Sequence, residues 1–489
     1  MNLLSTLSCL PLLIWLSSAG TSATNPLLST SAKACGLIAQ TISTNSAIFL
    51  PGSSEYASDV AHFALSAEQN STCSVEVGTA ADLRAIVKIL GSTRAPFAVK
   101  GGGHNLNPGF SSTSGVQLSM IRFNNIVYHA KSQTVDIGSG LIWDDVYAAL
   151  DAYNVSVVGG RATGVGVAGL LLGGGYSYKT NQYGLAVDSL TALEVVLPFG
   201  EVRTVTERSD PDLFFALRGG GNNFGIVTQF TMRTHAQGTV WGGSITYDGT
   251  RGDAVTNALL TYTTNNSDPR TGLQCTYATV SGESIVMVNL FYNGPTPPPG
   301  IFDSFLTIPS ISTDIGSRSY LSLIQSANTN LTAGVRGLYN TISHTAVTRN
   351  LTSAMRNQTN FYSSLLSSSS LLLAGYVVEP FIPSAYLQGK SATAYPPNRL
   401  ENIHPMNIYY AWTDPAFDDE MLRTSRTSAT LLKSVATAEG ILGSVLYPNY
   451  ALVGTSVNDL YGKHTERLRD IKRRFDPLNV MGLTGGFKL

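Results

Sequence analysis

The sequence predicts an α+β protein with more than one domain. The chain has 489 residues, which exceeds the usual size of a single domain. Short apolar segments alternate with helical patterns and glycine-rich loops up to about residue 235, whereas longer segments of alternating hydrophobicity follow. We therefore expect a glycine-rich first domain and a second domain in which helices back an antiparallel sheet.

The composition excludes several classes of protein. The 31 basic and 32 acidic residues leave a net charge of -1, which argues against a general nucleic-acid binder or a polybasic membrane binder. Apolar residues make up 43% of the chain, enough for a large core and too many for a disordered protein. The 47 glycines show no Gly-X-Y period, which excludes collagen, so their positions need another explanation.

The first residues have the pattern of a secretory signal. An apolar run over residues 10–16 precedes small residues up to Ala23, and it is far shorter than a membrane span requires. We therefore expect residues 1–23 to be a signal peptide, and the mature protein to be secreted without a membrane span. Six Asn-x-Ser/Thr sequons fit a secreted glycoprotein: Asn70, Asn154, Asn265, Asn330, Asn350 and Asn357.

Three cysteines remain once the signal containing Cys9 is removed. Secretion favours disulfides, and an odd number leaves one thiol unpaired. Cys35 and Cys73 lie close in the sequence and both precede the glycine-rich region, so we expect them to pair. Cys275 lies in a segment of strand-like alternation, where we expect a buried, unreactive thiol.

The first domain is expected to contain short elements in a regular order. Residues 80–90 form a helix, because Leu83, Ile86, Val87 and Leu90 recur at helical spacing. Residues 144–153 form a second helix with two acids in its first turn, where the helix dipole favours them. A third helix is expected at residues 212–217. Strands are expected at 97–100, 116–120, 126–129, 134–137 and 226–232, with a hairpin of 192–197 and 202–205.

The later part of the chain differs in pattern from about residue 236. Strands are expected at 284–292, 371–378 and 407–412, with a proline-rich loop at 295–300. A charged helix is expected at 464–474. We place the domains at 24–235, 236–435 and 436–489.

Four glycine clusters, at residues 101–103, 159–160, 164–175 and 219–221, lie within about 120 residues. Converging loops of this kind would present backbone N–H groups to a phosphate-rich ligand, although tight turns in a large enzyme would also use glycine. The usual phosphate motifs are absent: after Gly138 and Gly140, Trp143 occupies the third glycine position of G-x-G-x-x-G. The sequence also has no P-loop, no zinc motif and no G-x-S-x-G elbow, so it predicts a different dinucleotide cradle and no metal.

Five segments together resemble one family. They are Lys-Gly-Gly-Gly-His-Asn at 100–105, the run at 164–175, Arg-Gly-Gly-Gly-Asn-Asn-Phe-Gly-Ile-Val at 218–227, Tyr-Pro-Asn-Tyr at 447–450 and Phe-Asp-Pro-Leu-Asn-Val at 475–480. In order and spacing they resemble the berberine-bridge-enzyme-like FAD-linked oxidases of the vanillyl-alcohol-oxidase superfamily. The resemblance implies a PCMH-type FAD-binding domain made from residues 24–235 and the returning segment 436–489, with a substrate domain at 236–435.

The resemblance also implies how FAD is held. His104 matches the histidine that bonds to the flavin 8α-methyl group, and Ala162 stands where many relatives have a second, cysteine tether, so a single covalent link is expected. Val165 matches the position whose bulk controls oxygen access, and its small size favours an oxidase. The residues expected at the cofactor, with His104 and Val165, are Gly101, Gly102, Gly103, Asn105, Gly166, Gly173, Gly174, Gly175, Asn223, Phe224, Gly225, Val227 and Asn449.

Tyrosines are the expected acid–base residues. Tyr447 and Tyr450 match the family's Tyr-x-Asn-Tyr segment, and a nearby cation or the flavin would lower the pKa of whichever serves as base. Which of the two acts stays open, and Glu379 and Glu401 are alternatives. Tyr409 or Tyr410, whichever points inward, and Trp412 are expected to contact the substrate, and residues 398–399 are a candidate source of a cation.

The resemblance implies a secreted, monomeric FAD oxidase. It would transfer a hydride from an alcohol or amine carbon of a small molecule, a secondary metabolite or a sugar, to flavin N5, and O2 would reoxidise the flavin to give H2O2. Two alternatives remain: a flavin-containing cyclase with little net redox turnover, and a non-catalytic secreted glycoprotein.

Overall fold

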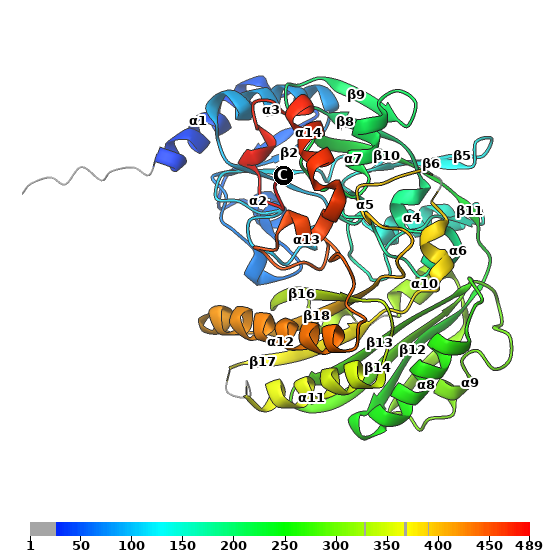
Figure 1. Ribbon diagram of the computed structural model, residues 1–489. Helices are drawn as coiled ribbons and strands as arrows, with labels where there is room; N and C mark the ends of the chain where they lie inside the picture. The colour runs from blue at the N-terminus through cyan, green and yellow to red at the C-terminus, as the bar shows by residue number, and fades with distance from the viewer. Residues whose placement is uncertain (1–25, 327–328, 366–368, 390) are drawn as a thin grey trace, which may run out of the picture.

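The computed structural model describes residues 26–326, 329–365, 369–389 and 391–489. The expected signal peptide therefore lies outside the described residues. The chain forms two stacked parts: residues from both ends of the sequence build one, and the middle of the sequence builds the other (Figure 1). This arrangement confirms the expected α+β class and the antiparallel second part. No helix in the described ranges is long and apolar enough to span a membrane.

A four-stranded sheet begins the first part. Its order is β1-β2-β4-β3, in which β2, β4 and β3 run parallel and β1 is antiparallel. Two helices pack together beside it, and Thr79 caps the second by accepting a hydrogen bond from Asp82 N–H. A disulfide joins Cys35 to Cys73, which confirms the expected pairing. The elements are α1 (Pro26–Thr41), β1 (Ala47–Phe49), α2 (Ser54–Val60), β2 (Cys73–Glu76), α3 (Ala80–Thr93), β3 (Phe97–Lys100) and β4 (Val116–Ser119).

A second sheet completes the first part. It has the order β5-β6-β10-β8-β9 and is antiparallel throughout. Its strands, α4 and α7 match the expected elements within one or two residues, whereas helix α5 was not expected. They are β5 (Ile126–His129), β6 (Thr134–Gly138), α4 (Trp143–Asp151), α5 (Val167–Leu172), β8 (Leu190–Val196), β9 (Val202–Thr206), α7 (Pro211–Leu217) and β10 (Ile226–Arg233).

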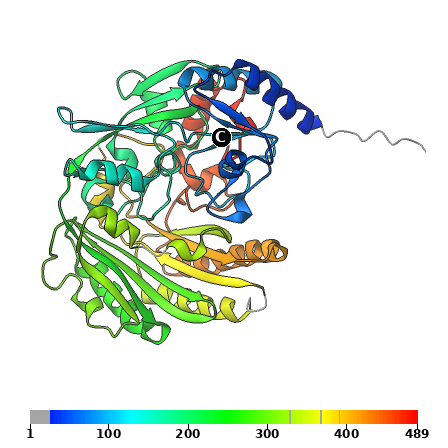
Figure 2. The ribbon, with the colours of Figure 1, turned by 180° about the vertical axis from the view of Figure 1, so that it is seen from behind.

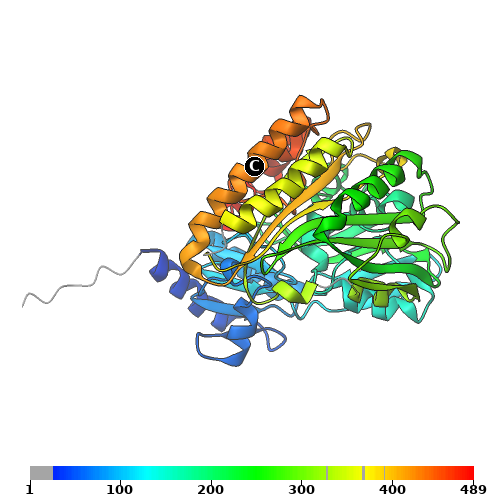
Figure 3. The ribbon, with the colours of Figure 1, turned by 90° about the horizontal axis from the view of Figure 1, so that it is seen from below.

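The second part is a seven-stranded antiparallel sheet, and helices α8, α11 and α12 cover its outer face (Figure 3). The strand order is β15-β12-β14-β13-β17-β18-β16. Cys275 on β13 is fully buried, as expected, in the core between sheet and helices. The elements are β12 (Val240–Asp248), α8 (Gly252–Asn265), β13 (Thr271–Val280), β14 (Glu283–Tyr292), β15 (Ser312–Arg318), β16 (Arg336–His344), α11 (Arg349–Leu365), β17 (Leu371–Val378), β18 (His404–Trp412) and α12 (Asp418–Ala438).

After α12 the chain returns to the first part, where its C-terminal segment lies beside the N-terminal elements (Figure 2). Helix α14 (Thr465–Phe475) packs against α7, and Asp212 on α7 forms ion pairs with Arg467 and Arg474. Leu468 and Ile471 of α14 are buried in the core of this part. This return brings residues 447–450 and 484–489 to the glycine loops.

Candidate active site

A cavity of about 740 Å³ lies where the glycine loops meet the seven-stranded sheet. Its size is typical of sites for a cofactor and a small molecule. One wall consists of segments 101–105, 161–173 and 221–227, and the other is the inner face of the sheet. The residues at 447–450 and, from the C-terminal segment, Gly486 and Phe487 complete the lining.

Backbone contact between two glycine loops forms the first wall. Gly102 follows β3 and Gly166 caps the start of α5, and a Cβ on Gly102 would lie 2.6 Å from the Cα of Gly166. A Cβ on Gly173 would lie 2.1 Å from Oδ1 of Asn449. Only glycine permits these approaches, so the backbone itself is presented to a ligand.

Most residues expected at the cofactor line this wall, but four do not. Asn223 is fully buried and donates its Nδ2 to the carbonyls of Gly220 and Phe487, so it holds the loop together behind the wall. Phe224 packs in the core. Gly174 and Gly175 have positive φ and face Tyr395 and Ala186 respectively. The residues that line the cavity are Gly101, Gly102, Gly103, His104, Asn105, Val165, Gly166, Gly173, Gly225, Val227 and Asn449.

His104 presents a neutral imidazole to the cavity. Its ring stacks on Phe63 with 4.3 Å between the ring centroids. Its Nε2 is buried and has no hydrogen-bond partner among the described residues. Burial lowers the pKa of His104 to about 4, so the ring is uncharged at neutral pH and keeps one nitrogen lone pair. The glycine wall and this unpartnered nitrogen fit a flavin dinucleotide.

A buried ion pair joins the two walls of the cavity. Arg161 Nη2 lies 2.7 Å from Glu379 Oε2, and the side chains are 8% and 1% exposed. Tyr450 donates its hydroxyl to Glu379 Oε1 at 2.8 Å and accepts from Arg161 Nη2 at 3.1 Å. Gln274 Nε2 donates to the same carboxylate oxygen at 3.1 Å. Glu379 therefore accepts a hydrogen bond from each of the other three groups.

The two tyrosines of the 447–450 segment lie in different surroundings. Both line the cavity from a turn. Their rings pack edge to face, with 4.9 Å between the ring centroids. Tyr447 accepts a hydrogen bond from Asn449 Nδ2, and burial raises its pKa to about 12. Burial and the Glu379 carboxylate raise the pKa of Tyr450 well above its usual value, against the opposite effect of Arg161. Arg161 alone therefore does not bring the pKa of either tyrosine below its usual value.

Strand β18 presents only one of its expected substrate residues. Tyr409 lines the cavity, whereas Tyr410 faces the helices and bonds Tyr376. Trp412 shares that outer face and donates its indole N–H to Asp418. Successive side chains on a strand alternate, so residues 410 and 412 lie on the same side. Tyr410 and Trp412 therefore do not face the cavity, and of the three expected substrate contacts only Tyr409 is retained.

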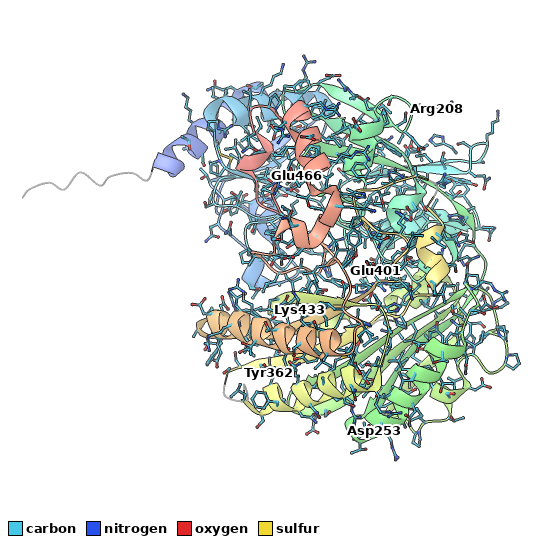
Figure 4. The ribbon with its side chains drawn as sticks, in the orientation of Figure 1. Arg208, Asp253, Tyr362, Glu401, Lys433 and Glu466 are labelled. Atoms are coloured by element: carbon cyan, nitrogen blue, oxygen red, sulfur yellow. A yellow bond between two sulfur atoms is a disulfide. The ribbon has the colours of Figure 1, made fainter. Side chains whose placement is uncertain are left out.

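The structure places the expected cation and one of the two alternative bases outside the cavity. Arg399 pairs with Asp188 and does not line the cavity; the cation there is Arg161. Glu401 accepts hydrogen bonds from Ser444 outside the cavity, in the segment before β18 (Figure 4). The other alternative base, Glu379, directly follows β17 and lines the cavity. Arg161 was not expected from the sequence, although its position as the one charged residue in the glycine-rich run 159–175 could have indicated it.

Comparison with known proteins agrees with the geometry. The model of a family described as "FAD binding domain" matches residues 71–206. The chain is 30% identical over 462 residues to FAD-dependent monooxygenase sdcF of Emericella nidulans, covering 90% of this chain and 95% of that protein. It is 29% identical to an uncharacterized FAD-linked oxidoreductase of Arthroderma benhamiae, covering 90% and 92%.

Solved structures share the fold at low identity. Glucooligosaccharide oxidase from Acremonium strictum superposes with a TM-score of 0.77 at 18% identity, covering 91% of this chain and 97% of that one. Physcomitrella patens BBE-like 1 gives 0.74 at 20% identity, covering 93% and 97%. 6-Hydroxy-D-nicotine oxidase from Arthrobacter nicotinovorans gives 0.75 at 21% identity, covering 90% and 97%.

Proposed function

Because the chain belongs to the berberine-bridge-enzyme-like family of FAD-linked oxidoreductases, we propose that it is an oxidase of a small molecule that carries an alcohol or amine carbon. The electron acceptor in this proposal is O2 and the product is H2O2. One observation carries the choice of site: the Tyr450–Glu379–Arg161 network lies in the same cavity as His104 and the glycine wall.

His104 is proposed to hold the cofactor through a single covalent bond. Its unpartnered, neutral Nε2 supports this role, because a nucleophile needs an available lone pair. Ala162, which also lines the cavity, has no side-chain group that could form a second bond. Val165 lines the same wall and is small, which supports access of O2.

The network supplies a route for the substrate proton. FAD, when bound, would supply the hydride acceptor at its N5 position. In the proposal the substrate O–H or N–H gives its proton to the oxygen of Tyr450 while Tyr450 gives its own proton to Glu379 Oε1. The raised pKa of Tyr450 suits a relay that never leaves a free phenolate. Arg161 and Gln274 orient the carboxylate, so they are positioning residues.

Secretion and glycosylation belong to the same proposal. The disulfide supports an oxidising compartment. The sequon asparagines whose exposure is described are all exposed, and they are Asn70, Asn154, Asn265, Asn350 and Asn357. A secreted monomer that needs only its small substrate and O2 is consistent with these features.

The tether has a direct test. Acid precipitation of the purified holoenzyme should give a yellow pellet, and His104→Ala should give a colourless one. His235→Ala is the matched control, because His235 also has a buried Nε2 without a partner but lies outside the cavity lining. A colourless wild-type pellet would contradict the covalent link.

The reaction class has a second test, in which substrate candidates are mixed with the enzyme without oxygen. Bleaching of the flavin, followed by one H2O2 per substrate when O2 is admitted, supports the oxidase. Incorporation of labelled oxygen from O2 into the product would instead show a monooxygenase, the activity in the name of the Emericella nidulans relative. Turnover without bleaching would show a cyclase.

A further inference from the structure

The backbone leaves the seven-stranded sheet at Glu379, and strand pairing does not hold it beyond that point. The last pair of β17 with β18 is Val378 with Met406, and Glu379 is the next residue. Pro380 follows, and proline has no backbone N–H with which to extend the ladder. The position of the Glu379 carboxylate therefore depends on the contacts that residues 381 and 382 make outside the sheet.

A histidine side chain provides the first of these contacts. The N–H of Phe381 donates to Nδ1 of His404, the first residue of β18, at 3.1 Å. The carbonyl of Phe381 accepts from Asn402 Nδ2 at 3.2 Å. Phe381 and His404 are 8% and 5% exposed, so water has little access to the N–H in place of the imidazole. Because a buried N–H without an acceptor is costly, this hydrogen bond constrains the segment that follows Glu379.

His404 can accept this hydrogen bond because its ring is neutral. The lone pair of Nδ1 faces Phe381, so the one proton of the neutral ring lies on Nε2. Burial holds the pKa of His404 well below its usual value, and the ring of His344 lowers it further, against the effect of a hydrogen bond with the Thr345 backbone. His344 is the titratable side chain that faces His404 across the register of β16 and β18, with 5.3 Å between the ring centroids. A protonated His404 would direct an N–H at the N–H of Phe381 and could not accept from it.

We propose that His404 is a positioning residue for the reaction, which holds the Glu379 carboxylate against the Tyr450 hydroxyl through the backbone of Phe381. Tyr450 donates to Glu379 Oε1 at 2.8 Å, and a displacement of about 1 Å would break this hydrogen bond. Phe381 is two residues from Glu379, so a shift of its backbone is passed directly to the carboxylate. The inference rests on the proposed function, because it takes Glu379 as the acceptor of the Tyr450 proton.

Two substitutions at position 404 separate the hydrogen bond from the space that the ring fills. His404→Leu fills much of this space but accepts nothing, whereas His404→Asn retains an acceptor, because its Oδ1 can take the position of Nδ1. The ring of Phe381 also stacks on Tyr176 with 5.0 Å between the ring centroids, so the segment keeps a second attachment in both variants. His344→Leu is the matched control, since it removes the other buried ring, whose Nδ1 bonds the carbonyl of Ala346.

The position of Glu379 can be measured without a substrate. In crystal structures of the holoenzyme, His404→Leu should lengthen the distance from Tyr450 Oη to Glu379 Oε1 to more than about 3.5 Å, beyond hydrogen-bond range. His404→Asn and His344→Leu should keep the distance near 2.8 Å. An unchanged distance in His404→Leu would overturn the proposal. An equal displacement in His344→Leu would also overturn it, because the cause would then be a general loss of packing.

The anaerobic half-reaction shows whether this position matters for the chemistry. With a compound that bleaches the wild-type flavin, His404→Leu should lower the rate of reduction at saturation about 100-fold and change the Kd less than about twofold, because positioning acts on the reacting atoms. His404→Asn should restore most of the rate, and His344→Leu should retain it. A full rate in His404→Leu, or no rescue in His404→Asn, would overturn the proposal.

The pH dependence of the same rate gives a readout that does not require His404→Leu to fold. In the wild type, the rate should fall as acid protonates His404 and removes the acceptor of the Phe381 N–H. His404→Asn does not titrate at this position, so it should lose this part of the acid limb. Identical profiles in the two proteins would overturn the proposal. If no compound bleaches the wild-type flavin, the proposed oxidase fails, and the crystal structures still decide whether His404 positions Glu379.

Discussion

Arg161 Nη2 and Glu379 Oε2 are 2.7 Å apart although 218 residues separate them in the sequence. Arg161 comes from the glycine-rich part and Glu379 from the end of β17 in the seven-stranded sheet. The contact thus connects the two walls of the cavity and fixes the position of the carboxylate that receives the Tyr450 hydroxyl. Since both side chains are almost completely buried, each depends on the other for charge compensation.

Removing one partner of this pair should destabilise the protein strongly. Arg161→Met leaves the Glu379 charge buried without its cation, and we expect the unfolding free energy to fall by about 3–5 kcal/mol. The double variant Arg161→Met/Glu379→Leu should recover most of that loss, because it buries no charge. Urea unfolding of both proteins, followed by intrinsic fluorescence, measures the difference. A double variant as unstable as Arg161→Met would show that the pair contributes through packing instead.

Tyr450 and Tyr447 should differ in their effect on catalysis. Tyr450→Phe removes the hydroxyl that contacts Glu379, and the rate of flavin reduction should fall by about 100-fold or more. Tyr447→Phe removes a hydroxyl whose partner is Asn449, and its effect should be about tenfold smaller. Stopped-flow measurement of the anaerobic half-reaction separates this step from reoxidation. Equal losses in the two variants would argue against a relay through Tyr450.

Local patterns in the sequence predicted much of the fold and the cofactor wall. The glycine clusters, the strand alternation and the position of His104 are all properties of short segments, and the structure retains them. The role of Arg161 is different, because it depends on a contact with a residue in another part of the fold. No local pattern contains that contact, although the single charge after two glycines marked the position.

The sequence also could not predict which face of a strand points into the cavity. Alternation predicts that Tyr409 and Tyr410 face opposite sides of β18, but it does not say which side faces the cavity. That choice depends on where α11 and α12 pack, which is a long-range property of the fold. The hydrogen bond from Phe381 to His404 is also a long-range property, since it joins the segment after β17 to the start of β18.

Acid should destabilise the protein through a buried histidine pair. The rings of His344 and His404 are 5.3 Å apart; burial lowers the pKa of His344 to about 4 and holds the pKa of His404 well below its usual value. The unfolded chain binds these protons near pH 6.5, whereas the folded chain does not. The stabilisation is therefore complete above about pH 6.5 and is lost as the pH falls toward 4.

The size of this loss can be measured. For His344 alone, a shift from 6.5 to about 4 corresponds to about 3 kcal/mol. Urea midpoints between pH 7 and pH 5 should fall less steeply in His344→Gln than in the wild type. His129→Gln is the control, because His129 is exposed and its ring is hydrogen-bonded to Asp136 on the surface. Identical slopes in His344→Gln and the wild type would reject this origin of acid sensitivity.

The last residues of the described chain should be needed to retain FAD. Asn222 Nδ2 donates to the carbonyl of Gly485, Asn223 Nδ2 donates to that of Phe487, and Lys488 Nζ donates to Asn222 Oδ1. Phe487 also lines the cavity. Residues 484–489 thus connect the glycine loop at 218–225 to the cavity wall.

The substitution Gly485→Ala tests whether residues 484–489 hold the cavity wall in place. A Cβ on Gly485 would lie 1.6 Å from the carbonyl oxygen of Gly109, so Gly485→Ala must displace the segment. We expect a lower melting temperature and, in a His104→Ala background where FAD is not tethered, FAD affinity about tenfold weaker. Gly238→Ala is the control, since no atom lies within 4 Å of its added Cβ. If Gly485→Ala retains FAD as well as Gly238→Ala does, the C-terminal segment contributes nothing to cofactor binding.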